Sequence, residues 1–556
     1  METSLDFETR IAVQAPKSGI ERKVVAACAT AVLLVGILEA WLSRYAMGSD
    51  GISYLDLGDA FWRGDWHSAL NGYWSPLYPV LLGAGSVVLK PDAYWQFPVV
   101  HFVNLIIFAC TVLSFQYFLS GFLRHRSDSL PGWLWTVLAY VLFAWATLRL
   151  IGVDLVSPDM CVAAFVFLAT GALLRINMDP APWRYALLGL ILGIGYLAKS
   201  PLMPIAIVML ACSAFAVDNW KRRVQLVGLA GVFFLLAAAP LIYALSNAKG
   251  RLTFGDSWAL NVAWYTNDVP RYYWHGDGGA LHPARQVFDS PPAYEFNGPV
   301  KGTYPIWFDP AYWSAGIKPH LSVAGALREI RLNGFVYYKL FLHLQAAVAG
   351  ICLVMFLMFG SGRKKWFLLI PPAVALVMYA PVHVEERMLG AYVVLLWLGL
   401  FSSIRIVTAE QRRYAYFCLL GLAVLETGRF GLSVIGVASS HHLHEPNTQA
   451  LIAESLHEHG VEAGDKVAWI RPEQFTSVQN YWWARLANVQ IVAEIPSGYE
   501  KAFWQADSGT QRRLMSSLHN AGAKALVITK MPEMASRAGW TAVGRDGYFV
   551  RFLNDE

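Results

Sequence analysis

Charged side chains are scarce in this chain of 556 residues. Asp, Glu, Lys and Arg make up 15% of it, whereas a soluble protein of this length carries about 25%. Hydrophobic residues make up 56%, and the mean hydropathy is +0.40. Apolar runs of roughly 18 to 25 residues recur, a length that spans a bilayer. The shortage of charge therefore excludes a soluble globular protein and predicts a polytopic α-helical membrane protein.

Cysteine pairs and a phosphate-binding loop are also missing. The six cysteines all lie in apolar runs and none forms a Cys-x-x-Cys pair, so we expect neither a disulfide framework nor a metal site of that kind. The C-terminal segment has no glycine-rich phosphate loop, which argues against nucleotide binding. The net charge of +5 comes from Lys and Arg clustered in short loops, where they set membrane orientation. We expect no nucleic-acid partner.

The apolar runs predict about eleven transmembrane helices. Lys and Arg cluster in alternate loops, and the positive-inside rule places those loops in the cytoplasm. Loops 46–96 and 247–335 then lie on the outer face. The segment 76–90 is short and begins with prolines, so we expect a helix lying in the membrane interface. The predicted spans cover residues 24–45, 97–121, 131–150, 158–175, 184–199, 201–217, 224–246, 336–359, 366–382, 388–408 and 413–437.

Three parts follow from this topology. Residues 1–23 form a cytoplasmic N-terminal segment, which is no cleavable signal peptide because the first apolar run is long enough to span. Residues 24–437 form the transmembrane domain, and residues 438–556 an extracytoplasmic domain. That last part alternates helical and strand-like runs, which predicts a small α/β unit. Its helices are expected at 447–459 and 510–520, and its strands at 467–470, 489–492 and 523–528.

An acid follows the first predicted span. Asp50, in Ser49-Asp50-Gly51-Ile52-Ser53-Tyr54, is a candidate general base that would take a proton from an attacking hydroxyl. The competing interpretation is a cap or turn residue before a helix at 52–63. We expect Asp56 and Asp59 to form the solvated face of that helix.

Two further acids approach the same outer boundary. Asp154 and Asp159 both lie in Val153-Asp154-Leu155-Val156-Ser157-Pro158-Asp159, and the sequence does not choose between them. Paired carboxylates can bind a divalent cation or position an acceptor. Asp159 also begins a predicted span after a proline, where an acid commonly caps a helix or pairs with its dipole.

Two cations stand at the outer boundary against the general charge trend. Lys199 ends a predicted span and could contact a lipid phosphate, or could extend its amine to the headgroups. Arg387, in His383-Val384-Glu385-Glu386-Arg387, could hold a phosphate bidentately or pair locally with Glu385 or Glu386.

The outer loop 247–335 is dense in aromatic residues and histidine. Aromatic faces and carboxylates suit a sugar-binding cleft, and aromatic residues equally suit an interfacial belt. Six prolines between residues 283 and 310 predict an ordered irregular lid. The histidines match no strong zinc spacing. The expected cleft residues are Tyr54, Glu39, His275, His282, Tyr304, Trp307 and Glu386.

Ionisable residues inside predicted spans are costly and are functional candidates by default. Glu39 lies in the first span. Glu426 and Arg429, in the last, are spaced for an intrahelical ion pair, which we expect them to form.

The order of these features resembles the GT-C glycosyltransferases, the group that includes protein O-mannosyltransferases and lipid A aminoarabinose transferases. The resemblance covers about residues 20–437. It is carried by an outer loop that opens with Asp50, by Pro76-Leu77-Tyr78-Pro79, Ser157-Pro158-Asp159, Lys199 and Arg387, and by a C-terminal outer domain.

The resemblance implies a sugar donor linked to polyprenyl phosphate and an inverting transfer on the outer, periplasmic face of a bacterial inner membrane. The acceptor would be a glycan, a lipid or a protein. Asp50 would be the base and Asp159 or Asp154 the supporting acid, while Lys199 and Arg387 would neutralise the leaving phosphate. Gly51 stands where many members carry a second acid, so a divalent cation at Asp50 stays open.

Three other functions compete with this interpretation. A secondary transporter would be expected to show an internal repeat, which this sequence lacks. An envelope-glycan ligase or polymerase would share the lipid-phosphate chemistry, so only its product distinguishes it. A non-catalytic membrane scaffold would leave the clustered acids and cations without a role.

Overall fold

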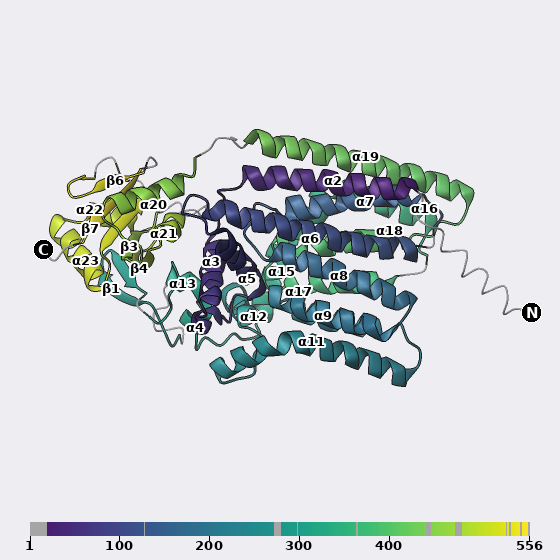
Figure 1. Ribbon diagram of the computed structural model, residues 1–556, viewed down its shortest axis with the longest axis horizontal. Helices are drawn as coiled ribbons and strands as arrows, with labels where there is room; N and C mark the ends of the chain where they lie inside the picture. The colour runs from purple at the N-terminus through teal and green to yellow at the C-terminus, as the bar shows by residue number, and fades with distance from the viewer. Residues whose placement is uncertain are drawn as a thin grey trace, which may run out of the picture.

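The computed structural model joins a long helical bundle to a smaller sheet domain through a layer of short helices (Figure 1). The bundle occupies the side toward the N-terminus, and the C-terminus lies in the sheet domain at the opposite end. The structure describes residues 19–126, 128–271, 280–296, 298–362, 365–440, 446–472, 481–529, 531–532, 535–544 and 547–553.

Every segment predicted to span the membrane is helical over most of its length. The bundle helices are α2 (Gly19–Leu42), α6 (Gln96–His125), α7 (Gly132–Trp145) continuing into η1 (Ala146–Ile151), α8 (Asp159–Met178), α9 (Pro182–Ala198), α10 (Leu202–Ala214), α11 (Trp220–Lys249), α15 (Val323–Tyr338) continuing into η3 (Lys339–Leu344), α16 (Ala346–Phe359), α17 (Trp366–Tyr379), α18 (Glu386–Phe401) and α19 (Ala409–Ser440).

Six of the described helices are long and apolar enough to cross a membrane. A seventh span is obtained if α15–η3 and α16, which meet at a bend of 76°, count as one. The polytopic helical membrane protein is therefore confirmed. The count of eleven spans stays a prediction because helices such as α9, α10 and α17 have only 13 to 17 residues.

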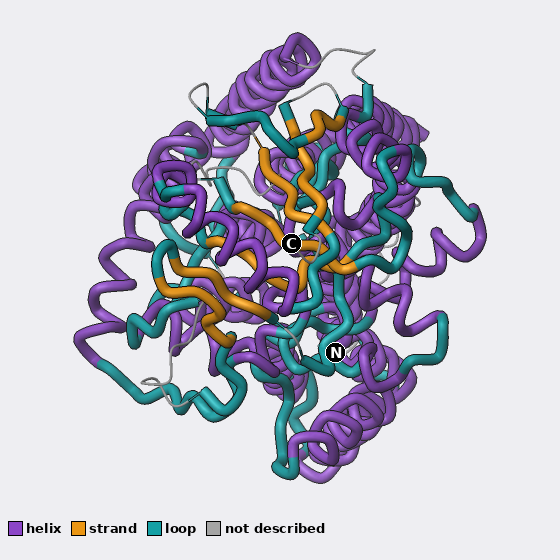
Figure 2. Tube along the Cα trace, turned by 90° about the vertical axis from the view of Figure 1, so that its left-hand side faces the viewer, coloured by secondary structure: helices purple, strands orange, loops and turns teal. Residues whose placement is uncertain are grey.

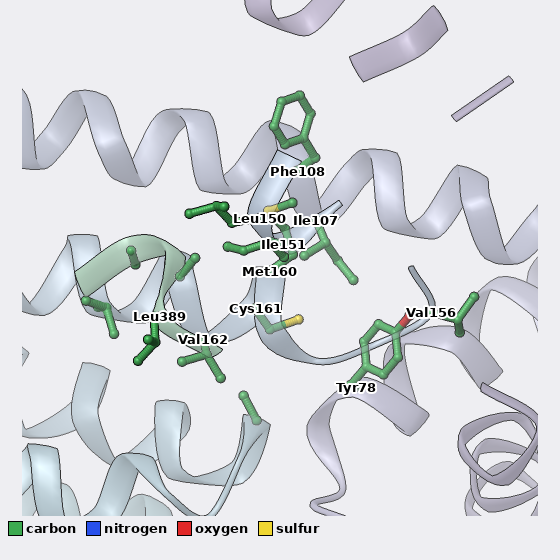
Figure 3. Packing of buried hydrophobic residues seen from close by; sticks show 14 of the residues in the cluster. Tyr78, Ile107, Phe108, Leu150, Ile151, Val156, Met160, Cys161, Val162 and Leu389 are labelled. Carbon is green, nitrogen blue, oxygen red and sulfur yellow. The ribbon is translucent and has the colours of Figure 1, made fainter. Parts of the chain in front are cut away.

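Aromatic and aliphatic side chains fill the centre of the bundle. Phe108 of α6, Ile151 of η1, Cys161 of α8 and Leu389 of α18 are buried in one cluster, which Figure 3 shows from close by. Cys161 lies in the first turn of α8, two residues after Asp159. The packing of this core therefore fixes the helix ends that carry the candidate site.

Short helices form the layer between the bundle and the sheet. They are α3 (Ser49–Trp62), α4 (Trp66–Ala69), α5 (Leu77–Leu89), α12 (Ser257–Asn261) continuing into η2 (Val262–Thr266), α13 (Pro305–Phe308) and α14 (Pro310–Trp313). The helix expected at 76–90 is α5. It packs closely on α3 because Gly58 and Gly83 let the two backbones approach, and a Cβ on Gly58 would lie 3.1 Å from the Gly83 nitrogen.

The described residues contain a seven-stranded sheet with the order β1-β2-β4-β3-β5-β7-β6. Strands β4, β3 and β5 are parallel, and the outer pairs are antiparallel. Figure 2 views the molecule from this end. The strands are β1 (Arg285–Asp289), β2 (Pro292–Glu295), β3 (Lys466–Ile470), β4 (Gln490–Ile495), β5 (Ala525–Thr529), β6 (Thr541–Val543) and β7 (Tyr548–Phe552), with helices α20 (Thr448–Glu458), α21 (Trp482–Leu486), α22 (Glu500–Gln505) and α23 (Ser508–Asn520).

The first two strands come from loop 247–335 rather than from the C-terminal segment. Tyr294 and Glu295 of β2 pair with Glu494 and Ala493 of β4. The expectation of a wholly irregular lid is therefore wrong for 285–295. A hairpin of four- and five-residue strands is too short to show a period in the sequence, and the edge of β4 completes it.

Arg485 of α21 connects the sheet domain to α3. It donates to Asp56 Oδ1 at 2.8 Å and to Asp59 Oδ2 at 2.6 Å, and its side chain is buried. Asp56 is buried as well and accepts from the backbone nitrogen and hydroxyl of Thr303. The expectation that Asp56 and Asp59 form a solvated face is therefore wrong. Both carboxylates face Arg485, which lies more than 400 positions away in the sequence and could not be foreseen from the local pattern.

Candidate active site

Four helix ends converge where the bundle meets the layer of short helices. Asp50 lies in the first turn of α3, Asp159 begins α8, and Arg387 is the second residue of α18. Lys199 immediately follows α9, which runs in the opposite direction. The positive ends of three helix dipoles therefore face this place, together with two cationic side chains, which favours an anion there.

Asp159 is the buried centre of the group. Its Oδ1 lies 2.7 Å from Lys199 Nζ and its Oδ2 lies 3.6 Å from Arg387 Nη1, while only 3% of the side chain is exposed. Lys199 is held in place through the next residue, since the Ser200 nitrogen donates to Ser75 Oγ at 3.1 Å. The structure thus brings together an acid and two cations that are scattered in the sequence.

Asp50 is the partly exposed acid of the same group. Arg387 Nη2 lies 3.8 Å from Asp50 Oδ2, and the indole Nε1 of Trp307 donates to Oδ1 at 3.1 Å. The side chain is 32% exposed, yet burial of the carboxylate raises its pKa above the usual value, against the opposing effects of Arg387 and Trp307. Gly48 is the N-cap of α3, and Asp50 caps nothing. An oriented, accessible carboxylate of raised pKa suits a general base.

Aromatic rings line the side of the site that faces loop 247–335. The indole of Trp307 packs against Tyr73, Trp74 and Trp264, with ring centroids 5.7 to 6.1 Å apart. This packing fixes the indole nitrogen that holds Asp50. The sequence placed Trp307 in the cleft but could not show its hydrogen bond to Asp50.

The residues before α18 form a chain of contacts, of which the sequence suggested only the pair between Arg387 and Glu385. Arg387 Nε lies 2.6 Å from Glu385 Oε2, and Glu385 Oε1 lies 3.0 Å from His383 Nε2. The imidazole of His383 stacks on the ring of Tyr265 at 4.1 Å. The only signal in the sequence is the alternation of His383, Glu385 and Arg387, which an extended strand places on one side.

Asp154 stands apart from the group around Asp159. Its side chain is exposed, in the turn between η1 and α8. Of the two acids between which the sequence did not choose, Asp159 is the one that contacts Lys199 and Arg387.

Several expected cleft residues have structural partners. Glu39 is buried in α2 and forms a bidentate ion pair with Arg149, at 2.8 and 3.0 Å. Glu386 lies 3.0 Å from Lys339 Nζ. Both carboxylates tie helices together. The pair Glu426–Arg429 forms as expected, at 2.8 Å.

The remaining cleft candidates are aromatic or histidine. Tyr54 is buried between the rings of Trp74 and Tyr78, at 5.0 and 5.1 Å. The Tyr304 hydroxyl donates to Glu494 of β4 at 2.8 Å, so this residue ties loop 247–335 to the sheet. The exposed His282 stacks on Tyr312 at 4.3 Å, and His275 lies outside the described residues.

A divalent cation does not fit the described donor set. Nowhere in the residues that the structure describes do three or more His, Cys, Asp or Glu side chains come together in a way that could hold a metal ion. Asp50 and Asp159 instead both face the guanidinium of Arg387. We therefore derive no step through a metal.

No family model matches the sequence, and no curated protein matches it. Among solved structures, the chain is similar to ArnT from Cupriavidus metallidurans bound to undecaprenyl phosphate, with a TM-score of 0.52 and 13% identity over 95% of this chain and 97% of that one. ArnT in the apo state matches with a TM-score of 0.49 and 13% identity, over 94% and 97%. An Archaeoglobus fulgidus oligosaccharyltransferase in complex with Zn and sulfate matches with 0.47 and 12%, over 91% and 68%.

Only the first of these scores exceeds 0.5, and it extends over nearly the whole of both chains. The chain therefore shares the fold of ArnT, which agrees with the resemblance that the sequence predicted. At 13% identity the likeness establishes this fold, and the activity has to be argued from the chemistry of the site.

Proposed function

We propose that this protein is a membrane glycosyltransferase that moves a sugar from a polyprenyl-phosphate donor to a hydroxyl acceptor on the outer face of the membrane. The observation that supports this proposal is that four charged side chains lie together at one site, namely Asp50, Asp159, Lys199 and Arg387. One accessible carboxylate and two cations side by side are what this transfer needs: a base for the acceptor and positive charge for the leaving phosphate. In a bacterium this face is the periplasmic face of the inner membrane.

The phosphate end of the donor would bind between Arg387 and Lys199. A guanidinium can hold two phosphate oxygens at once, and an ammonium acts as a point charge. Asp159 keeps Lys199 in place and balances part of its charge until the donor arrives. The helix N-termini of α8 and α18 add partial positive charge at the same place.

The transfer itself is a single displacement. Asp50 takes the proton of the acceptor hydroxyl while that oxygen attacks the anomeric carbon of the sugar. The bond between the anomeric carbon and the phosphate oxygen breaks, and its electron pair leaves with the polyprenyl phosphate. Attack opposite to the leaving group inverts the anomeric configuration.

The first experiment measures sugar transfer in proteoliposomes supplied with a panel of polyprenyl-phosphate sugars. Wild type is compared with Asp50→Asn and with the control Asp92→Asn. Asp92 is an exposed acid of the same outer side, and its Oδ1 accepts a hydrogen bond from the Trp95 nitrogen, which an asparagine can also accept. We expect Asp50→Asn to bind undecaprenyl phosphate but to lose transfer by at least about a hundredfold, the contribution of a general base. Asp92→Asn should transfer like wild type.

Two outcomes contradict the proposal. Absence of both binding and turnover in the wild type with every donor would argue for a transporter or a scaffold. Unchanged turnover in a folded Asp50→Asn would remove Asp50 as the base and make Asp159 the next residue to test.

A further inference from the structure

Among the described residues, the guanidinium of Arg387 donates a hydrogen bond through Nε alone. Nε lies 2.6 Å from Glu385 Oε2, which is a short charge-assisted hydrogen bond. Nη1 and Nη2 lie 3.6 Å from Asp159 and 3.8 Å from Asp50, beyond hydrogen-bond distance. Within the described part of the chain neither terminal nitrogen donates a hydrogen bond. Both are therefore available to an incoming anion.

Asp159 also lacks a hydrogen bond to this guanidinium. Its Oδ2 is buried and has no hydrogen-bond partner among the described residues, although Arg387 stands 3.6 Å away. An arginine on a flexible side chain would normally close such a gap, because a hydrogen bond between two charged groups is among the strongest in proteins. The shortest contact of the guanidinium is instead its Nε hydrogen bond to Glu385.

Glu385 is the group that can hold the guanidinium back. It is the N-cap residue of α18 but makes no side-chain cap hydrogen bond, so capping does not account for it. Its second oxygen pairs with His383, whose ring is stacked on Tyr265. The carboxylate is thus fixed at both oxygens, and the guanidinium is fixed through it.

We propose that Glu385 is a positioning residue that holds Arg387 by Nε, so that its two terminal nitrogens face the donor phosphate instead of closing onto Asp50 and Asp159. This inference rests on the proposed function. It unites the two interpretations of Arg387 that the sequence left open. The local pair with Glu385 orients the guanidinium so that its two terminal nitrogens can bind the phosphate.

The inference predicts two effects of removing the anchor. In Glu385→Ala, Arg387 moves onto Asp159 and Asp50, so its terminal nitrogens are no longer available and the donor phosphate binds more weakly. Loss of the Glu385 charge lowers the pKa of Asp50 in Glu385→Ala and Glu385→Gln alike, and a cation closer to Asp50 lowers it further in Glu385→Ala alone. The acidic limb of the pH–rate profile, which follows ionisation of the base, therefore moves to lower pH.

The test measures two quantities in nanodiscs for Glu385→Ala, Glu385→Gln and the control Glu454→Ala, an exposed acid of the sheet domain. These are the Kd for undecaprenyl phosphate and the pH profile of transfer. We expect Glu385→Ala to raise Kd at least about tenfold, as for loss of a charge-assisted hydrogen bond, and to shift the acidic limb down. Glu385→Gln keeps an oxygen for Nε and should stay within about threefold of wild type. Glu454→Ala should match wild type.

Each other outcome has a separate meaning. Wild-type affinity in Glu385→Ala, with an acidic limb at the same pH as in Glu385→Gln, would overturn the inference and leave the proposed function intact. Equal losses of affinity in Glu385→Ala and Glu385→Gln, with equal shifts of the limb, would make Glu385 merely structural. No binding and no transfer by the wild type would mean that the proposed function itself fails. If Glu385→Ala does not fold, Glu385→Asp, too short to reach Nε from the same backbone, replaces it.

Discussion

Arg485 is the residue whose loss should weaken the contact between the sheet domain and α3. Its side chain is 9% exposed and donates to Asp56, Asp59 and Gln96. Replacing it by methionine keeps most of the volume but leaves Asp56 buried without its cation. Breaking a buried ion pair from one side costs about 3–5 kcal/mol.

Two features of the structure reduce this figure. Asp56 keeps two donors from Thr303, at 2.7 and 2.9 Å. Asp59 is 25% exposed, so water can solvate it. We therefore expect Arg485→Met to destabilise the protein by about 2–3 kcal/mol, less than the full cost of breaking a buried pair.

The effect should depend on pH with a defined sign. Burial raises the pKa of Asp56 above its usual value, and Arg485 opposes this rise. Without Arg485 the pKa rises further, so the folded state favours the protonated acid and its stability falls as pH increases through the folded-state pKa. Destabilisation by Arg485→Met should be greater at pH 8 than at pH 5.

Thermal unfolding in detergent, followed by tryptophan fluorescence, measures the effect for Arg485→Met and for the control Arg63→Met. Arg63 also pairs with Asp59, but at 3.9 Å and with 66% of its side chain exposed, so its removal should cost less than about 0.5 kcal/mol. The double variant Arg485→Met/Asp56→Asn should recover part of the loss. Equal effects of the two arginine variants, or no recovery by the double variant, would refute this account of the interface.

Two further predictions concern Asp50 and the bundle. Trp307→Phe removes the indole donor that lowers the pKa of Asp50, so the acidic limb of the pH–rate profile should move to higher pH; an unchanged or lowered limb would show that the hydrogen bond does not act on the base. Arg149→Met leaves Glu39 buried without its cation and should destabilise the protein by about 3–5 kcal/mol, measured as a fall in Tm. Adding Glu39→Gln to this variant should recover part of the lost stability. A Tm unchanged by Arg149→Met would contradict this.

The sequence by itself determined which segments are helices of a membrane protein. The length of an apolar run decides this locally, because a backbone in lipid must satisfy its own hydrogen bonds. The same local reasoning found Asp50, Asp159, Lys199 and Arg387, since charged groups at the ends of apolar helices are few. It could not choose between Asp154 and Asp159, which lie five positions apart and differ in burial only after α8 has packed.

Only the tertiary structure decided how distant groups meet. Arg485 reaches Asp56 across more than 400 residues, and the hairpin β1–β2 joins the edge of β4 from a separate loop. Trp307 holds Asp50 across 257 positions. Local sequence carries no signal for such pairs, because each partner alone resembles an ordinary surface charge or interfacial aromatic residue. Their burial, and therefore their energy and their chemistry, exists only once the helices, the lid and the sheet have come together.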